Sequence, residues 1–284
     1  MNYKLVKNYL DDKTIKWSPM REGAGLGMAE LGEEKKDMVL LGADTIESCR
    51  AHYFAKKFPE RTIECGVAEQ NLIGVSAGLA YNGKVPYAVT YSPFLIGRPW
   101  EPIRTTIAYP NNHVVFVASH AGIATGSDGP THQMTEDIAL TRCLPNFTVI
   151  CPCDHEQALK AVKAAYDLKG PVYVRCARGG SASGGKDSIE IEVINLHTIK
   201  PIDEKTIVKS AKKTGKVFTV EDHNIIGGMG SAVAELLGEN HPVPIKIYGV
   251  MDQFTESGSV KDLWEKYKLD KDGIKKTIIK FLSK

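Results

Sequence analysis

The stretch that decides the fold is VVFVASHAGIATGSDGPTHQ, residues 114–133. Residues 114–118 are apolar and mostly β-branched, which predicts a buried strand. Residues 120–133 (HAGIATGSDGPTHQ) form a glycine-rich loop with two histidines and an aspartate, and residues 134–138 are typical of a helix start. Open α/β sheets bind ligands at such strand-to-helix loops. The stretch therefore predicts a parallel sheet with a ligand site at the carboxyl end of one strand.

Three side chains of this loop are candidates for binding. His120, Asp128 and His132 offer donors and acceptors suited to a polyhydroxylated or phosphorylated substrate. The glycines between them let the backbone bend and approach a ligand closely. A surface loop with incidental histidines is the alternative, but the grouping of all three residues favours a site.

The same alternation of strand-like and helical segments extends over most of the chain. Between residues 37 and 175 it predicts parallel strands with helices on both faces. A glycine- and serine-rich stretch follows, and we expect a linker at 179–189. A second, shorter alternation begins with a short strand at 193–194, and the pattern at 270–284 predicts an amphipathic helix. We thus expect an α/β protein of two three-layer, parallel-sheet domains, over residues 1–178 and 190–284.

Composition excludes several classes of function. A net charge of +2 argues against a nucleic-acid-binding protein. The six cysteines are scattered without a zinc-binding spacing, so we expect no metal ligands among them and reduced thiols in the cytoplasm. The 284 residues contain no apolar span of 18 residues, so we expect no membrane insertion.

Other candidates lie outside the loop. Glu69 stands between a strand and an apolar helix, where a carboxylate either favours the helix dipole or, if buried, transfers protons. Tyr91 and Phe94 either pack in the core or line a flat pocket for a heteroaromatic ring. Arg21, Arg175 and Arg178 are candidate anion ligands. The residues 221–223 (EDH) suggest a catalytic cluster, but helix capping and a buried histidine are the favoured interpretation because no nucleophile is evident.

Several separated motifs together resemble the C-terminal half of transketolase. They are LGADTIES at 41–48, CGVAEQ at 65–70, HAGIATGSDGPTHQ at 120–133 and VEDHNIIGGMG at 220–230. They occur in the order found in that family and cover essentially the whole chain. The resemblance implies a pyrimidine-binding domain followed by a smaller C-terminal domain, and chemistry that depends on thiamine diphosphate.

The resemblance also implies roles for individual residues. Glu69 matches the glutamate that hydrogen-bonds the aminopyrimidine ring and has a catalytic role. Tyr91 and Phe94 match aromatic residues around that ring, and Asp44 matches an acid near the cofactor. The remaining matches concern the sugar phosphate. Arg21, Ser48, His120 and Arg178 match residues that bind it, and Asp128 matches a residue that contacts its C2 hydroxyl. His132 matches a histidine beside the reacting carbons, and we expect both His120 and His132 to be catalytic.

The sequence departs from the family at three places. Family members commonly have Arg-Glu-His where this chain has AEQ at 68–70, and phenylalanine is usual at the position of Tyr91. The chain also contains no GDG motif, which in full-length transketolase belongs to the diphosphate domain. The first two differences bear on the details of the pocket and the substrate preference. The missing GDG motif suggests a split enzyme whose other subunit is a separate chain, or else a piece of a longer protein.

The expected protein is therefore a transketolase subunit that is inactive alone. Its partner would be a diphosphate-binding N-terminal subunit that holds most of the Mg²⁺ or Ca²⁺ site, in an α2β2 assembly that transfers a two-carbon ketol unit between sugar phosphates of the pentose phosphate pathway. The alternatives are a 1-deoxyxylulose-5-phosphate synthase-like enzyme, a 2-oxoacid dehydrogenase β subunit, and a non-catalytic regulatory subunit. The Asp128–His132 sequence, DGPTH, favours transketolase over the first two.

Overall fold

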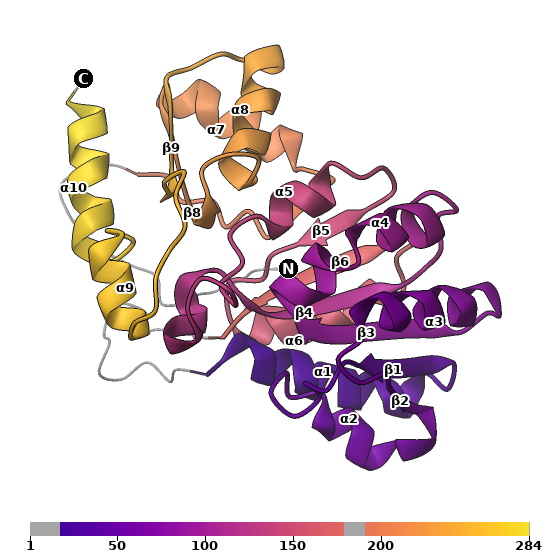
Figure 1. The fold of residues 1–284 in the computed structure, drawn as a ribbon. Coiled ribbons are helices and arrows are strands. Elements are labelled where there is room, and N and C mark those ends of the chain that lie inside the picture. The colour runs from indigo at the N-terminus through magenta and orange to yellow at the C-terminus, as the bar shows by residue number, and fades with distance from the viewer. Residues whose placement is uncertain (1–17, 179–190, 284) are drawn as a thin grey trace.

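The computed structural model describes residues 18–178 and 191–283. The expected linker at 179–189 lies outside the described residues, as does the beginning of the expected first domain. Figure 1 shows a larger sheet wrapped by helices and a smaller α/β unit above it. The predicted α/β class is confirmed.

The larger sheet has seven strands, and all but one of its pairings are parallel. The spatial order is β2-β1-β3-β4-β6-β5-β7, and only β7 pairs antiparallel, with β5. Strand β4 lies in the middle and every one of its residues is buried, which explains the apolar sequence of its first four residues, 115–118. The strands are β1 (Met38–Gly42), β2 (Thr62–Glu64), β3 (Val85–Tyr91), β4 (Val115–Ala121), β5 (Thr148–Ile150), β6 (Val172–Ala177) and β7 (Thr198–Lys200).

Helices cover both faces of this sheet. The helices α1 (Met20–Glu34), α2 (His52–Lys57) and α6 (His155–Ala165) pack in one core with alternate strand residues such as Leu40 and Val117. The helices α3 (Glu69–Tyr81) and α5 (Asp137–Arg142) form the opposite core with residues such as Leu41 and Phe116. This alternation along each strand gives the predicted three layers.

Helix α1 carries an unusual number of glycines for a buried helix. A Cβ at Gly23 would lie 2.1 Å from the carbonyl oxygen of His155, and one at Gly27 would lie 2.8 Å from that of Leu159. Both carbonyls belong to α6, so the glycines allow the two helices to approach closely. Glycine lowers helix propensity, which is why the sequence pattern did not predict α1.

The segment that follows β3, residues 93–108, is helical but irregular. The structure has π-helical turns at η2 (Pro93–Gly97) and η3 (Ile103–Ala108), separated by the short α4 (Trp100–Pro102). Prolines 93, 99 and 102 break the regular hydrogen-bond ladder here, and π-helical turns are frequent at functional sites.

The second unit is built on a parallel pair, β8 (Val217–Asn224) and β9 (Ile245–Val250). The expected strand at 193–194 was wrong, because those residues form no strand. Strand β7 follows instead and joins the first sheet. The amphipathic C-terminal helix is present, with Phe281 6.1 Å from Phe218 between ring centroids. The helices of this unit are α7 (Glu204–Thr214), α8 (Met229–Asn240), α9 (Val260–Lys266) and α10 (Lys271–Leu282).

Candidate functional site

The predicted site residues gather at the carboxyl edge of the parallel sheet. Asp44 follows β1, Tyr91 ends β3, His120 lies near the end of β4, and Arg178 follows β6. These strands are neighbours in the order β1-β3-β4-β6. The sheet topology therefore brings together four segments that are distant in the sequence, as the parallel arrangement predicts.

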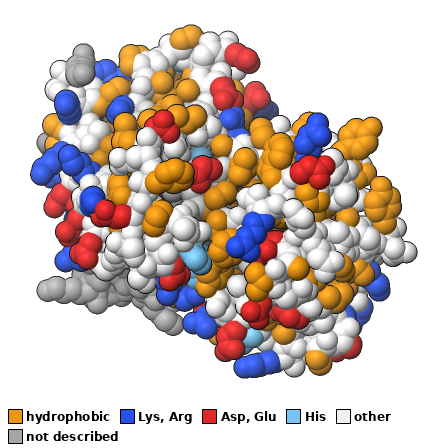
Figure 2. Space-filling model, in the orientation of Figure 1, with side chains coloured by type: hydrophobic (Ala, Val, Ile, Leu, Met, Phe, Trp, Pro, Cys, Tyr) orange, Lys and Arg blue, Asp and Glu red, His pale blue; other side chains and the backbone are white. Residues whose placement is uncertain are grey.

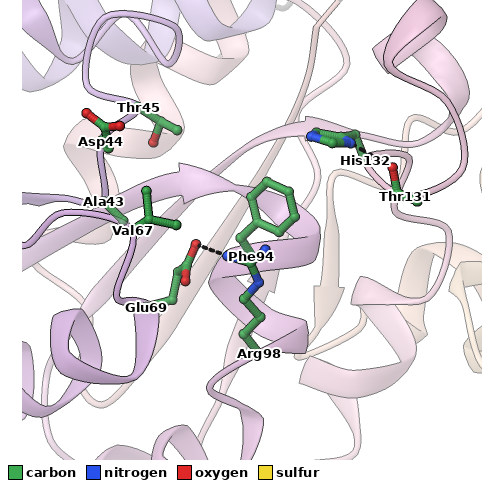
Figure 3. A pocket seen from close by; sticks show the side chains of 9 residues that line it. All are labelled: Ala43, Asp44, Thr45, Val67, Glu69, Phe94, Arg98, Thr131 and His132. Atoms are coloured by element: carbon green, nitrogen blue, oxygen red, sulfur yellow. Dashed lines mark hydrogen bonds and ion pairs between the residues drawn. The ribbon is translucent and has the colours of Figure 1, made fainter.

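A pocket of about 380 Å³ opens at this edge. Ala43 and Val67 line it with apolar side chains. Figure 3 shows Asp44 and Thr45 on one side of the pocket and Thr131 and His132 on the other. The other lining residues are Glu69, Phe94 and Arg98. Four predicted residues, Asp44, Glu69, Phe94 and His132, thus line one cavity.

Glu69 is the buried acid of this pocket. It is the first residue of α3, and only 5% of it is exposed. Its Oε1 accepts a hydrogen bond of 2.8 Å from the Arg98 guanidinium, whose Cζ lies 4.2 Å from the centroid of the Phe94 ring. Arg98 was not predicted. A position four residues after Phe94 faces the same side of a helical turn, which is the signal that could have found it.

His120 lies in a buried, cationic setting next to the pocket. Its Nε2 is 3.3 Å from the Arg21 guanidinium, which can only donate, so Nε2 accepts and Nδ1–H donates to Ser119 Oγ at 2.7 Å. Burial, and then the charges of Arg21 and Arg178, lower the pKa of His120 to about 3. His120 is therefore neutral at physiological pH, with its tautomer set by its neighbours.

Two of the predicted arginines adjoin His120. Arg21 donates to the carbonyl oxygen of Ser48 at 2.9 Å, and Arg178 lies 3.6 Å from the Asp128 carboxylate. Burial, followed by the nearby charges of Arg50 and Arg178, lowers the pKa of Arg21. Since these guanidinium groups repel one another, an anion bound between them would be stabilised. We call Arg21, Ser48, His120 and Arg178 the cationic corner.

Tyr91 connects the cationic corner with the pocket. Its ring stacks on His120 with centroids 3.7 Å apart and lies parallel to Phe94 at 6.0 Å. His132 contacts the Phe94 ring edge-on at 5.1 Å. In Figure 2, histidine side chains are visible near the middle of this face, beside a hydrophobic surface. The pocket and the cationic corner are thus linked through the contacts of the Tyr91 ring.

The second unit holds the loop that carries these residues. The Gln133 side chain donates to the carbonyl oxygens of Gly126 and Glu256 at 3.1 and 3.0 Å, and Ser257 donates to the carbonyl of Ser127. The loop includes the 3-10 helix η4 (Ile123–Asp128), and its Ile123 packs with Val250 and Leu263. The position of Asp128 therefore depends on both units.

A buried polar network behind the site was not predicted. Asp137 is fully buried and accepts from Arg175 Nε at 2.7 Å and from Tyr173 at 2.6 Å. Burial alone would raise the pKa of Asp137, but Arg175 holds it below its ordinary value. The signal in the sequence is Arg175 itself, since a charge within an apolar strand requires a partner.

The cluster at 221–223 is structural, as the favoured interpretation held. Glu221 accepts hydrogen bonds from the backbone N–H groups of Met229 and Gly230 at 2.6 and 2.8 Å, and so caps α8. Asp222 accepts from the N–H of Ile123 at 3.0 Å. His223 is fully buried, with its Nδ1 donating to the Asn224 carbonyl at 2.7 Å.

Within residues 18–178 and 191–283, no group of three or more His, Cys, Asp and Glu side chains could hold a metal ion. None of the helices in these ranges is long and apolar enough to cross a bilayer.

The fold is that of an α/β protein with a larger and a smaller sheet, and a candidate ligand site lies at the carboxyl edge of the larger one. The chain belongs to the transketolase family. Residues 18–181 match the transketolase pyrimidine binding domain, and residues 182–274 match the transketolase C-terminal domain. The resemblance stated from the sequence motifs is thereby confirmed, and membership of this family implies dependence on thiamine diphosphate.

Three relatives have the length of this chain. A putative transketolase C-terminal section of Methanocaldococcus jannaschii is 40% identical, over 93% of this chain and 96% of that protein. One subunit of the apulose-4-phosphate transketolase of Phocaeicola vulgatus is 34% identical, over 90% of this chain and 95% of that subunit. A solved structure described as "Split gene transketolase, inactive beta4 tetramer" matches with a TM-score of 0.83 and 38% identity. The match covers 93% of this chain and 98% of that chain.

The pocket fits the pyrimidine half of thiamine diphosphate. It combines the Phe94 ring and the apolar side chains of Ala43 and Val67 with one buried carboxylate, that of Glu69. Among the described residues, the Glu69 carboxylate bonds only to Arg98, and its Oε2 has no hydrogen-bond partner there. A flat heteroaromatic ring with a hydrogen-bond donor on its edge suits this set.

Proposed function

We propose that this chain is the C-terminal subunit of a split, thiamine diphosphate-dependent transketolase. It transfers a two-carbon ketol unit from a ketose phosphate to an aldose phosphate. The observation that carries the proposal is the juxtaposition of the Glu69–Phe94 pocket with the cationic corner across Tyr91. A ring-binding slot beside an anion-binding site is what a sugar phosphate reaction on this cofactor requires.

The residues of the pocket hold and orient the cofactor in this proposal. When bound, thiamine diphosphate supplies the carbon nucleophile that breaks and forms the carbon–carbon bond. Glu69 accepts a hydrogen bond from the aminopyrimidine ring, and Phe94 stacks on the ring. Asp44 lies on the same wall, and Tyr91 places His120 beside the bound ring.

The cationic corner binds the phosphate of the sugar. Arg21 and Arg178 supply charge-assisted hydrogen bonds, and Ser48 and His120 complete the site. Asp128 is 3.6 Å from Arg178 and accepts a hydrogen bond from a sugar hydroxyl. His132, which lines the pocket, exchanges protons with hydroxyls near the reacting carbons.

The partner is a diphosphate-binding subunit that holds the Mg²⁺ or Ca²⁺ ion. The names of the two relatives describe a C-terminal section and one subunit of a transketolase, and this chain covers nearly their whole lengths. Both names support a split arrangement, and we propose an α2β2 assembly. We further propose that the enzyme acts in the cytoplasm, in the pentose phosphate pathway. The six free cysteines suit such a reducing compartment.

Reconstitution tests this proposal. The chain is mixed with a diphosphate-binding transketolase subunit, thiamine diphosphate and Mg²⁺, and ketol transfer is followed with ketose phosphate donors and an aldose phosphate acceptor. Activity is expected only in the mixture. Full activity of this chain alone would contradict the shared site.

The choice of donor separates the other thiamine enzymes. Turnover with pyruvate but not with ketose phosphates would favour a 1-deoxyxylulose-5-phosphate synthase or a 2-oxoacid dehydrogenase. A complex that binds the cofactor and transfers nothing from any donor would favour a regulatory subunit. A panel of ketose phosphates is needed because one relative is named for apulose 4-phosphate.

A further inference from the structure

The side chain of Arg98 lies between the two pocket residues to which the proposed function assigns the aminopyrimidine ring. Figure 3 shows its guanidinium reaching from the end of η2 toward Glu69 and beneath the Phe94 ring. One nitrogen is 2.8 Å from Glu69 Oε1, and the Cζ is 4.2 Å from the Phe94 centroid. The side chain thus contacts the acid and the aromatic ring at once.

The chemistry of a guanidinium matches that of the ring it would face. Both groups are flat, both stack on an aromatic ring, and both present N–H donors to a carboxylate. A ring that stacks on Phe94 and bonds to Glu69 needs the space that Arg98 fills. Two flat groups cannot occupy this slot together, because the distances from Arg98 to Glu69 and Phe94 leave no room for a layer between them.

We propose that Arg98 is an internal ligand of the cofactor site, which the aminopyrimidine ring must displace. This inference rests on the proposed function. Its guanidinium closes the slot in the free chain and stabilises the buried Glu69 carboxylate until the ring takes over that hydrogen bond.

The exposure of the two side chains makes displacement feasible. About half of the Arg98 side chain is accessible (48%), whereas Glu69 is 5% accessible. Arg98 can therefore turn into solvent, while Glu69 stays in place. The apparent affinity for the cofactor is reduced by the fraction of molecules in which the slot is open.

Removing Arg98 should therefore tighten cofactor binding. Arg98→Met keeps the length of the side chain but removes the charge and the donors, so it leaves Glu69 unpaired in the free protein. Both effects favour the ring, and we expect the dissociation constant to fall about ten-fold. If Arg98 instead stays bound to Glu69 and orients it for the cofactor, the same substitution weakens binding.

The measurement is calorimetric titration of thiamine diphosphate, with Mg²⁺ present, into the complex of this chain with its diphosphate-binding partner. Arg104→Met is the matched control, since Arg104 is an exposed arginine six residues further along that does not line the pocket. It should bind like the unmodified protein. Arg98→Lys, which keeps the charge but loses the planar fork, should bind with an intermediate affinity.

The outcomes separate the two proposals. A complex that binds no thiamine diphosphate at all contradicts the proposed function. Suppose instead that the unmodified complex binds the cofactor. If Arg98→Met then binds it with an affinity within two-fold of the unmodified complex, or more weakly, this contradicts the displacement of Arg98 but not the proposed function. If Arg98→Met fails to co-elute with the partner, the Arg98→Lys titration decides by the same criterion.

Discussion

Glu69 is the side chain on which the proposed chemistry depends most. It combines near-complete burial with a free carboxylate oxygen facing a pocket. Glu69→Gln keeps the shape but removes the negative charge that would polarise the ring through their hydrogen bond. We expect turnover of the assembled enzyme to fall by about 10²–10⁴-fold, and Glu69→Ala to lose nearly all of it.

The steady-state rate of ketol transfer measures this effect. Glu60→Gln is the control, because Glu60 is exposed and outside the pocket, and it should leave the rate unchanged. Near-normal turnover of Glu69→Gln would remove Glu69 from its proposed role.

His120 makes a prediction about stability and pH. Its pKa is lowered to about 3 in the folded chain, whereas an exposed histidine in the unfolded chain titrates near its ordinary value of 6.5. Below pH 6.5 the unfolded state therefore binds a proton that the folded state does not. The stability that His120 contributes is present above pH 6.5 and is lost as the pH falls, at a slope of up to about 1.4 kcal/mol per pH unit.

Urea unfolding at pH 7 and pH 5 tests this linkage. Between pH 7 and pH 5, the free energy of unfolding should fall by about 2 kcal/mol more in the unmodified chain than in His120→Gln. Equal losses in the two proteins would show that His120 titrates normally. Proton NMR of the imidazole gives an independent check, because its resonances should not shift between pH 8 and pH 5.

At the scale of elements, the loop after β4 depends on a close approach at Gly122. Its φ is +74°, and a Cβ there would lie 2.1 Å from Asp222 Oδ2. Gly122→Ala should therefore add a steric clash to the backbone strain, and we expect a loss of stability of about 3 kcal/mol or more. Since Asp222 also binds the Ile123 N–H, the clash should displace the loop and raise the KM for the sugar phosphate.

Gly83→Ala is the matched control. Gly83 has a φ of +75° but no atom within 4 Å of its added Cβ, so this substitution introduces the strain without the clash. We expect a loss of about 1 kcal/mol. Equal losses of unfolding free energy for the two variants would contradict the packing argument.

The elements also show what the sequence could predict. Local patterns predicted the strands and most helices of the first unit, because buried parallel strands and amphipathic helices carry strong periodicity. They did not predict α1, since its glycines serve contacts with α6 that only the folded chain contains. The prolines in 93–102 were visible, but the π-helical turns they accompany depend on packing against α3 and α5.

The same distinction applies to the site. Its loop residues could be predicted because parallel topology brings the carboxyl ends of strands together. Arg98 and Asp137 were missed because their importance depends on partners 29 and 38 residues away, Glu69 and Arg175. A local pattern can single out Arg98 or Arg175, but it does not identify the distant partner.

At the scale of the whole molecule, Arg175 joins the two units. It pairs with buried Asp137 in the first unit and donates to the Asp222 carbonyl in the second at 2.8 Å. Arg175→Met should leave the Asp137 carboxylate buried without its cation. We expect the free energy of unfolding to fall by about 3–5 kcal/mol, measured by urea denaturation.

A surface arginine provides the comparison. Arg104→Met should change the unfolding free energy by less than about 0.5 kcal/mol, because Arg104 is exposed. A loss in Arg175→Met no larger than this would mean that the buried network adds nothing to stability.

Strand β7 ties the C-terminal half of the chain to the sheet of the N-terminal half. It follows residues 179–190 in sequence, yet it forms the edge of the first sheet, pairing with β5, and the Lys200 ammonium bonds to the Arg142 carbonyl at 2.9 Å. The C-terminal half therefore donates a strand to the N-terminal half. A protease site engineered into 179–190 should yield two fragments that remain associated by strand complementation and elute together in gel filtration. The peptide bond between the units would then be dispensable for holding the folded halves together.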